Sequence, residues 1–153
     1  MKSIKTILMV VAVMGLFSTS YACKRHKKNK KNKVEQTVTN NAKATLNKGW
    51  KLMEMRDGAN SIKDFSRDVT LQLNTRENGL NGRGPCNSYF GSFTSDYVST
   101  FKATNVGSTK MYCEESMKNE DLFFAHLDQT TAFKIINGKL NLYKGDQILM
   151  VFE

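Results

Sequence analysis

The region 50–153 is built from short stretches in which apolar and polar residues alternate, and each stretch ends in residues typical of turns. Residues 69–74 are an example, with an apolar side chain at every second position. Such alternation places the apolar side chains on one face, as in a β-strand with one buried side. The pair Asn78-Gly79 follows at once, and both residues tolerate the positive φ of a tight hairpin. The pattern favours a mainly β domain.

The C-terminal part gives the clearest strand signals. Residues 132–136, 140–143 and 148–152 form three such stretches, separated by turns that contain Gly138 and Gly145. This arrangement predicts a three-stranded antiparallel meander. Further strands are expected over residues 50–55, 69–74, 89–93 and 98–106.

One segment, from Ser116 to Gln129, has helical spacing, because its large apolar residues fall on one stripe. Glu120 and Asp121 lie towards its N-terminal end, where the helix dipole favours acidic side chains. Together with the strands, this helix predicts an α+β, mainly β fold. We expect an antiparallel sheet curled into a partial barrel, with one α-helix packed on it.

The first 22 residues have the three parts of a secretory signal. Lys2 and Lys5 precede an apolar run over residues 7–17, and Ser20 and Ala22 give the small-x-small pattern of a cleavage site. The apolar run is shorter than the about 20 residues that a membrane-spanning helix needs. We therefore expect residues 1–22 to be a signal peptide and the protein to be exported.

Cys23 follows the expected cleavage site and resembles the cysteine of a bacterial lipobox, which receives a diacylglycerol. Ser20 and Tyr21 match that motif poorly. If the other two cysteines pair, an unlipidated Cys23 would be an odd free thiol in a secreted protein. Lipidation at Cys23 is therefore the favoured interpretation, and a soluble periplasmic or secreted protein is the alternative.

Residues 23–48 contain many Lys and Asn residues and almost no large apolar ones, which predicts a disordered tether. Nine of the 23 basic residues lie in the leader and in residues 24–33, which leaves 14 basic residues against 14 acidic ones. The net charge of +9 therefore belongs to these N-terminal segments, and a nucleic-acid partner is not expected. Beside an acyl chain, the lysines would attract anionic lipid headgroups, or they would only keep the tether solvated.

The motif Gly82-Arg83-Gly84-Pro85-Cys86-Asn87-Ser88-Tyr89-Phe90-Gly91, the later Thr109-Lys110-Met111-Tyr112-Cys113 and the helix with Glu120 resemble the META domain. This domain occurs in the heat-shock protein HslJ and in many bacterial envelope lipoproteins. The residues that carry the resemblance, besides the two cysteines, are Gly82, Gly84, Asn87, Tyr89, Gly91, Thr109, Met111 and Glu120.

The resemblance covers residues 49–153, which we take as a META-like domain. Pro85 and Tyr112 depart from the family pattern, where glycine and a small residue are usual. The resemblance implies a compact β-rich fold with a helix, an envelope location, and the association with stress or antibiotic tolerance that some members have. It implies no established catalytic activity.

Cys86 and Cys113 have three possible roles: a disulfide, half of a metal site, or a nucleophile with a spare thiol. An oxidising compartment favours the disulfide. A metal site needs two further ligands, and the sequence holds only His26 and His126, one of them in the tether. We therefore expect a disulfide between Cys86 and Cys113, with no metal and no cofactor.

No common catalytic motif occurs in the sequence. We expect a non-enzymatic envelope protein that binds an unknown envelope protein or small ligand and is held at the membrane surface by the lipid and the basic tether. The alternative is an inhibitor of an envelope enzyme, or a hydrolase with a polar site near Asn87, Tyr89 and Thr109.

Overall fold

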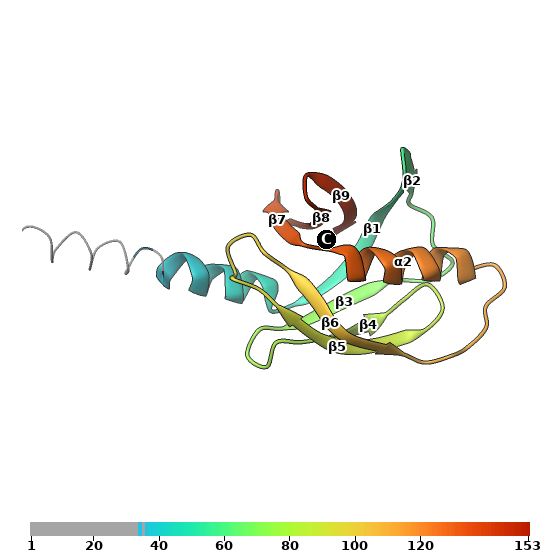
Figure 1. Ribbon diagram of the computed structural model, residues 1–153, viewed down its shortest axis with the longest axis horizontal. Coiled ribbons are helices and arrows are strands. Elements are labelled where there is room, and N and C mark those ends of the chain that lie inside the picture. The colour runs from blue at the N-terminus through green and yellow to red at the C-terminus, as the bar shows by residue number, and fades with distance from the viewer. Residues whose placement is uncertain (1–33, 35) are drawn as a thin grey trace, which may run out of the picture.

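The computed structural model describes residue 34 and residues 36–153 as one sheet with two helices, which confirms the expected mainly β fold class (Figure 1). One helix covers residues 36–46 and the other, α2, covers Met117–Gln129. The strands are β1 (Gly49–Asp57), β2 (Asn60–Ile62), β3 (Thr70–Asn74), β4 (Gly79–Arg83), β5 (Ser88–Thr94), β6 (Lys102–Ser108), β7 (Ala132–Ile136), β8 (Lys139–Lys144) and β9 (Gln147–Phe152).

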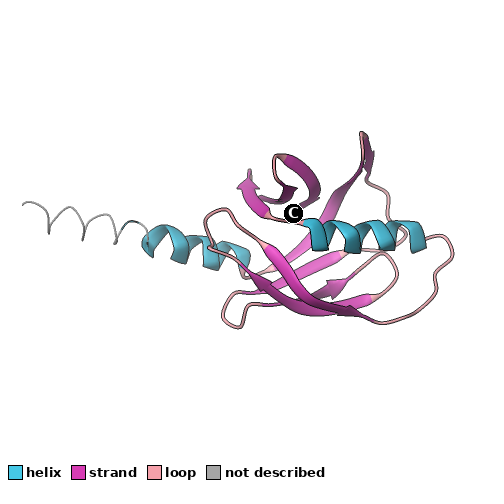
Figure 2. Ribbon diagram, viewed as in Figure 1, coloured by secondary structure: helices cyan, strands magenta, loops and turns pink. Residues whose placement is uncertain are grey.

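The nine-stranded sheet is antiparallel and has the order β6-β5-β4-β3-β1-β9-β8-β7, with β2 paired to β1 outside this path. Its two edges meet only just before β6. There the Phe101 N–H donates to the Thr131 carbonyl (3.1 Å) and the Phe133 N–H donates to the Ser99 carbonyl (2.7 Å). Beyond this short contact the edges diverge, and α2 packs against β6 beside the opening (Figure 2). The sheet is therefore a partly closed barrel with a helix along its open seam.

The alternation in the sequence determines which side chains form the core. Trp50, Leu71 and Phe93 point inwards from β1, β3 and β5, and Phe123 of α2 packs with them in the same buried cluster. Asn78 and Asn137 have positive φ values of 53° and 51°, as expected at the two Asn-Gly turns.

The strand expected over residues 98–106 begins only at Lys102. The Asp96 carboxylate oxygen Oδ1 accepts hydrogen bonds from the N–H groups of Val98, Ser99 and Thr100. This local turn competes with strand pairing, as is common for Asp side chains. It therefore delays the start of β6.

The helix over residues 36–46 differs from the disordered tether that we expected up to residue 48. Leu46 is completely buried, and its carbonyl accepts a hydrogen bond from Trp50 Nε1 (3.3 Å). The Thr75 N–H donates to Asn47 Oδ1 (3.1 Å), and Lys43 Nζ lies 4.5 Å from the ring centre of Tyr97. The polar composition of this segment alone would not stabilise a helix. These tertiary contacts do, because one apolar residue reaches the core.

Residues 1–22, Cys23 and residues 24–33 of the expected tether lie outside the described residues. Within the part of the chain that is described, neither helix is long and apolar enough to cross a bilayer.

We predict that Leu46→Ala lowers the free energy of unfolding by about 2–5 kcal/mol, because it removes a buried side chain and leaves a cavity. Val38, on the same helix, is 50% exposed, so Val38→Ala serves as the matched control and should change stability little. Urea denaturation of both variants checks this. Equal stability of the two variants would show that the helix does not belong to the folded domain.

Candidate functional site

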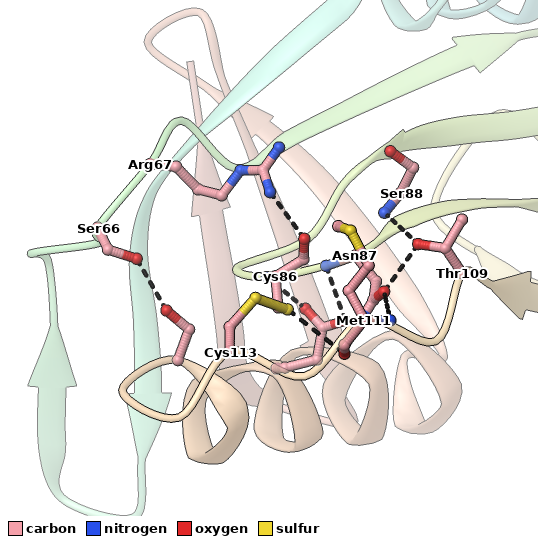
Figure 3. Close-up of a disulfide and its surroundings, with 10 residues drawn as sticks. Ser66, Arg67, Cys86, Asn87, Ser88, Thr109, Met111 and Cys113 are labelled. Carbon is pink, nitrogen blue, oxygen red and sulfur yellow. Dashed lines mark hydrogen bonds between the residues drawn. A yellow bond between two sulfur atoms is a disulfide. The ribbon is translucent and has the colours of Figure 1, made fainter.

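Part of the family-like motif, including Asn87, Thr109 and Met111, gathers around a disulfide between Cys86 and Cys113 (Figure 3). Cys86 lies in the loop between β4 and β5, and Cys113 lies in the loop between β6 and α2. Their Cα atoms are 5.9 Å apart, and Cys86 is buried. This is the pairing expected from the sequence, and it connects two loops through cysteines that are 27 residues apart.

Glu120, in the first turn of α2, is bound to the same β4–β5 loop through both carboxylate oxygens. The Cys86 N–H donates to Oε2 (2.8 Å) and the Asn87 N–H donates to Oε1 (3.1 Å). The side chain is only 3% exposed, so water does not replace these donors. A Cβ atom at Gly84 would lie 2.7 Å from Oε2, so a larger residue there would push the carboxylate away.

Asn87 uses its side chain to bind the peptide group of Met111. Its Oδ1 accepts from the Met111 N–H (2.7 Å), and its Nδ2 donates to the Met111 carbonyl (3.1 Å). Oδ1 also accepts from the Thr109 hydroxyl (2.7 Å), which itself accepts from the Ser88 N–H (3.2 Å) (Figure 3). The polar atoms of Asn87 and Thr109 are thus engaged in holding the β6–α2 loop against β5.

Tyr89 crosses β4 to reach β3. Its hydroxyl donates to the Thr70 carbonyl (2.8 Å). The path is open because Gly82 lies between them, and a Cβ there would come within 2.0 Å of the Thr70 oxygen and 2.9 Å of the Tyr89 hydroxyl. Burial raises the pKa of the Tyr89 hydroxyl far above its usual range, so the group remains a hydrogen-bond donor rather than an acid or base.

Gly91 lies opposite an irregularity in β6. The register between β5 and β6 shifts after Phe90, and Asn105 has a φ of 52°. A Cβ at Gly91 would come within 3.0 Å of the backbone of Asn105 and Val106. The glycine therefore makes room for a β-bulge in β6.

The two departures from the family pattern have different surroundings. Pro85 is buried in the β4–β5 loop, whereas Tyr112 is 78% exposed and adds nothing to the core. Sequence reasoning missed one contact, in which the guanidinium of Arg67 donates a hydrogen bond to the Cys86 carbonyl (2.7 Å). Because Arg67 lies in an irregular loop, no periodicity or motif pointed to it.

The structure does not bring Asn87, Tyr89 and Thr109 into one cavity. Asn87 and Thr109 line a cavity of about 350 Å³ beside α2. Tyr89 lines a separate groove of about 690 Å³ together with Lys51 and Arg83. Since the polar atoms of all three are also hydrogen-bonded within the domain, the arrangement suits a structural role better than acid–base or nucleophilic chemistry.

We predict that Glu120→Gln lowers the free energy of unfolding by about 2 kcal/mol, because the amide NH₂ would face an N–H donor and leave it buried without a partner. Asp121→Asn is the matched control, since Asp121 is adjacent and exposed. Chemical denaturation of both variants measures the effect. A Glu120→Gln protein as stable as the control would contradict this structural role.

We predict that replacing both Cys86 and Cys113 with serine lowers the free energy of unfolding by about 3–4 kcal/mol, the chain-entropy value for a loop of this length. Cys23→Ser, outside the domain, should leave it unchanged. Denaturation curves test this, and mass spectrometry after nonreducing digestion should recover the linked peptides. Two free thiols in the oxidised native protein would refute the pairing.

Comparison with known proteins agrees with this geometry. No curated protein matches the chain. In fold the chain is similar to a protein from Burkholderia xenovorans whose structure was determined by NMR, with a TM-score of 0.57 and 19% sequence identity over 75% of this chain and 86% of that one. The model of the META domain matches residues 42–153, which include the last turn of the N-terminal helix, the disulfide and every residue that contacts it. The chain therefore belongs to the META domain family.

Proposed function

We propose that this protein is an exported lipoprotein of the bacterial cell envelope, anchored through Cys23, whose META domain acts by binding an envelope protein or a small ligand and not by catalysis. The biological outcome that we propose is tolerance of stress or of antibiotics. The basic segment 24–33 would add attraction to anionic lipid headgroups.

The observation that carries the non-enzymatic interpretation is the use of polar groups around the disulfide. Glu120, Asn87 and Thr109 are the chemically versatile side chains of the family motif. Glu120 and Asn87 are hydrogen-bonded to the backbone of a neighbouring loop, and the Thr109 hydroxyl binds the Asn87 side chain and the Ser88 N–H. Groups that hold a scaffold in this way are poorly placed to exchange protons with a substrate. The alternative of a hydrolase at Asn87, Tyr89 and Thr109 gains no support from their separate cavities.

Support for a binding role comes from the surface. The loop that follows β6 exposes Met111 (53%) and Tyr112 (78%) on a backbone fixed by the disulfide and by Asn87. Exposed apolar side chains on a rigid loop are typical of contact surfaces, because little conformational entropy is lost when they are covered.

For the anchor, we expect cells that produce the full chain to incorporate an alkyne-tagged fatty acid into it, and we expect Cys23→Ser to abolish this labelling. Ser18→Ala is the control for normal export. Labelling is read by click chemistry and gel fluorescence, and membrane association by fractionation. A wild-type protein that is exported but carries no fatty acid would contradict lipid anchoring.

For the binding role, crosslinking in intact cells followed by purification should recover a reproducible envelope partner or ligand with the wild-type domain. Recovery should fall with the double serine variant of Cys86 and Cys113, because the contact loop loses its support. Failure to recover any reproducible partner would contradict the proposed binding function.

A further inference from the structure

At the open seam of the barrel, one edge of β6 has no strand partner among the described residues. Near its end, the Thr109 N–H donates to the Ser88 carbonyl (3.0 Å), which faces β5. Because N–H groups alternate in direction along a strand, the N–H of Ser108 points the other way, towards the seam. In the described part of the chain, no hydrogen bond connects this edge of β6 with α2.

A cleft lies beside this edge, where β6 and α2 meet. A cavity of about 270 Å³ lies between residues 103–108 and the helix, with Phe124 and Leu127 on its helical wall. The cavity of about 350 Å³ beside the loop after β6 adjoins it, because Ser108 and Phe124 line both. The combined cleft thus has a free strand edge on one wall and the half-buried ring of Phe124 on the other.

The helical wall also carries negative charge. Asp128 lines the first cavity and Asp121 lines the second, and neither has an ion-pair partner among the described residues. The two residues are seven positions apart, so they lie on one side of α2, about two turns from each other. Lys110 is the basic residue on the opposite wall. Unpaired acids beside an apolar surface favour a partner with both basic and apolar side chains.

We propose that this cleft binds an extended peptide that adds as a strand to the free edge of β6. Its backbone pairs with the edge around Ser108, an apolar side chain packs on the half-buried Phe124, and lysine or arginine side chains reach Asp121 and Asp128. Strand addition of this kind gains affinity from main-chain hydrogen bonds and specificity from the pockets beside them. The inference deepens the proposed binding function, on which it rests, by naming the surface and the class of ligand.

The bulge at Asn105 and Val106 is consistent with a selective site. A bulge interrupts the regular spacing of N–H and C=O groups along an edge and so discourages indiscriminate pairing. An incoming strand therefore pairs mainly at the Ser108 end, where the apolar cleft and Asp121 also lie.

The test uses the purified mature protein and a displayed library of random linear peptides. We expect enriched peptides to combine basic and apolar residues at alternating positions. Their affinity, measured by fluorescence anisotropy, should fall about tenfold in Ser108→Pro, which removes the free N–H and places a ring in the strand's path. Ser108→Ala keeps the N–H and is the matched control.

The contribution of the two aspartates to peptide binding is tested separately, with variants that leave the backbone intact. Asp121→Asn and Asp128→Asn should each weaken binding about threefold, and this loss should shrink at high salt. Asp146→Asn, on the turn between β8 and β9, is the control. These variants also keep the inference testable if Ser108→Pro does not fold.

Three outcomes would overturn the proposal: no enrichment of peptides, enrichment of acidic peptides, or equal binding by the variants and their controls. If no peptide binds to the cleft while crosslinking in cells still recovers a specific partner, the cleft is not the binding site but the general binding function stands. If both experiments fail, the proposed function fails as well.

Discussion

The carboxylate of Glu120, with its two backbone N–H donors, is the interaction on which the arrangement of the motif residues depends. It joins the first turn of α2 to Cys86 and Asn87 in the β4–β5 loop. Hydrogen bonds to a charged group contribute about 1.5–3 kcal/mol each, more than ordinary ones. The disulfide and the Asn87 side chain then attach the loop before α2 to the same place. Three independent links thus converge on one short segment.

This convergence explains how a barrel with an open seam can be stable. The two edge strands share only a short contact before β6, so the sheet alone does not hold the seam together. With its N-terminal end fixed at the disulfide, α2 lies along the opening and places Phe123 and Leu127 in the core. The helix covers the core without pairing with β6, and the cleft follows from that geometry. The structural links and the proposed binding surface therefore both follow from the position of α2 along the seam.

The sequence predicts those parts of the fold that local pattern determines. The C-terminal meander follows from alternation and two glycine turns, and α2 follows from its apolar stripe. The helix over residues 36–46 was not predictable in this way, because its stability depends on Leu46 reaching a core assembled from distant strands. Composition describes that segment as a polar linker, and only tertiary contact reveals otherwise.

In the candidate site, too, some features were predictable from the sequence and others were not. The residues of the motif were identified from the family resemblance, but their roles were not. Glu120 looked like an acid placed by the helix dipole, whereas its main contacts are with a loop more than 30 residues earlier. Arg67 carries no sequence signal at all, since it reaches the Cys86 carbonyl from an irregular loop. Long-range hydrogen bonds of single side chains have no periodicity to detect.

The most direct test of this account is native-state hydrogen exchange of the amides of Cys86, Asn87 and Met111, followed by NMR. If these amides are held by Glu120 and Asn87, they should exchange only through global unfolding, at the rate of the core strands β3 and β8. Exchange of these three amides much faster than that of the core strands would contradict the account, because it would show that the loops open independently of the fold.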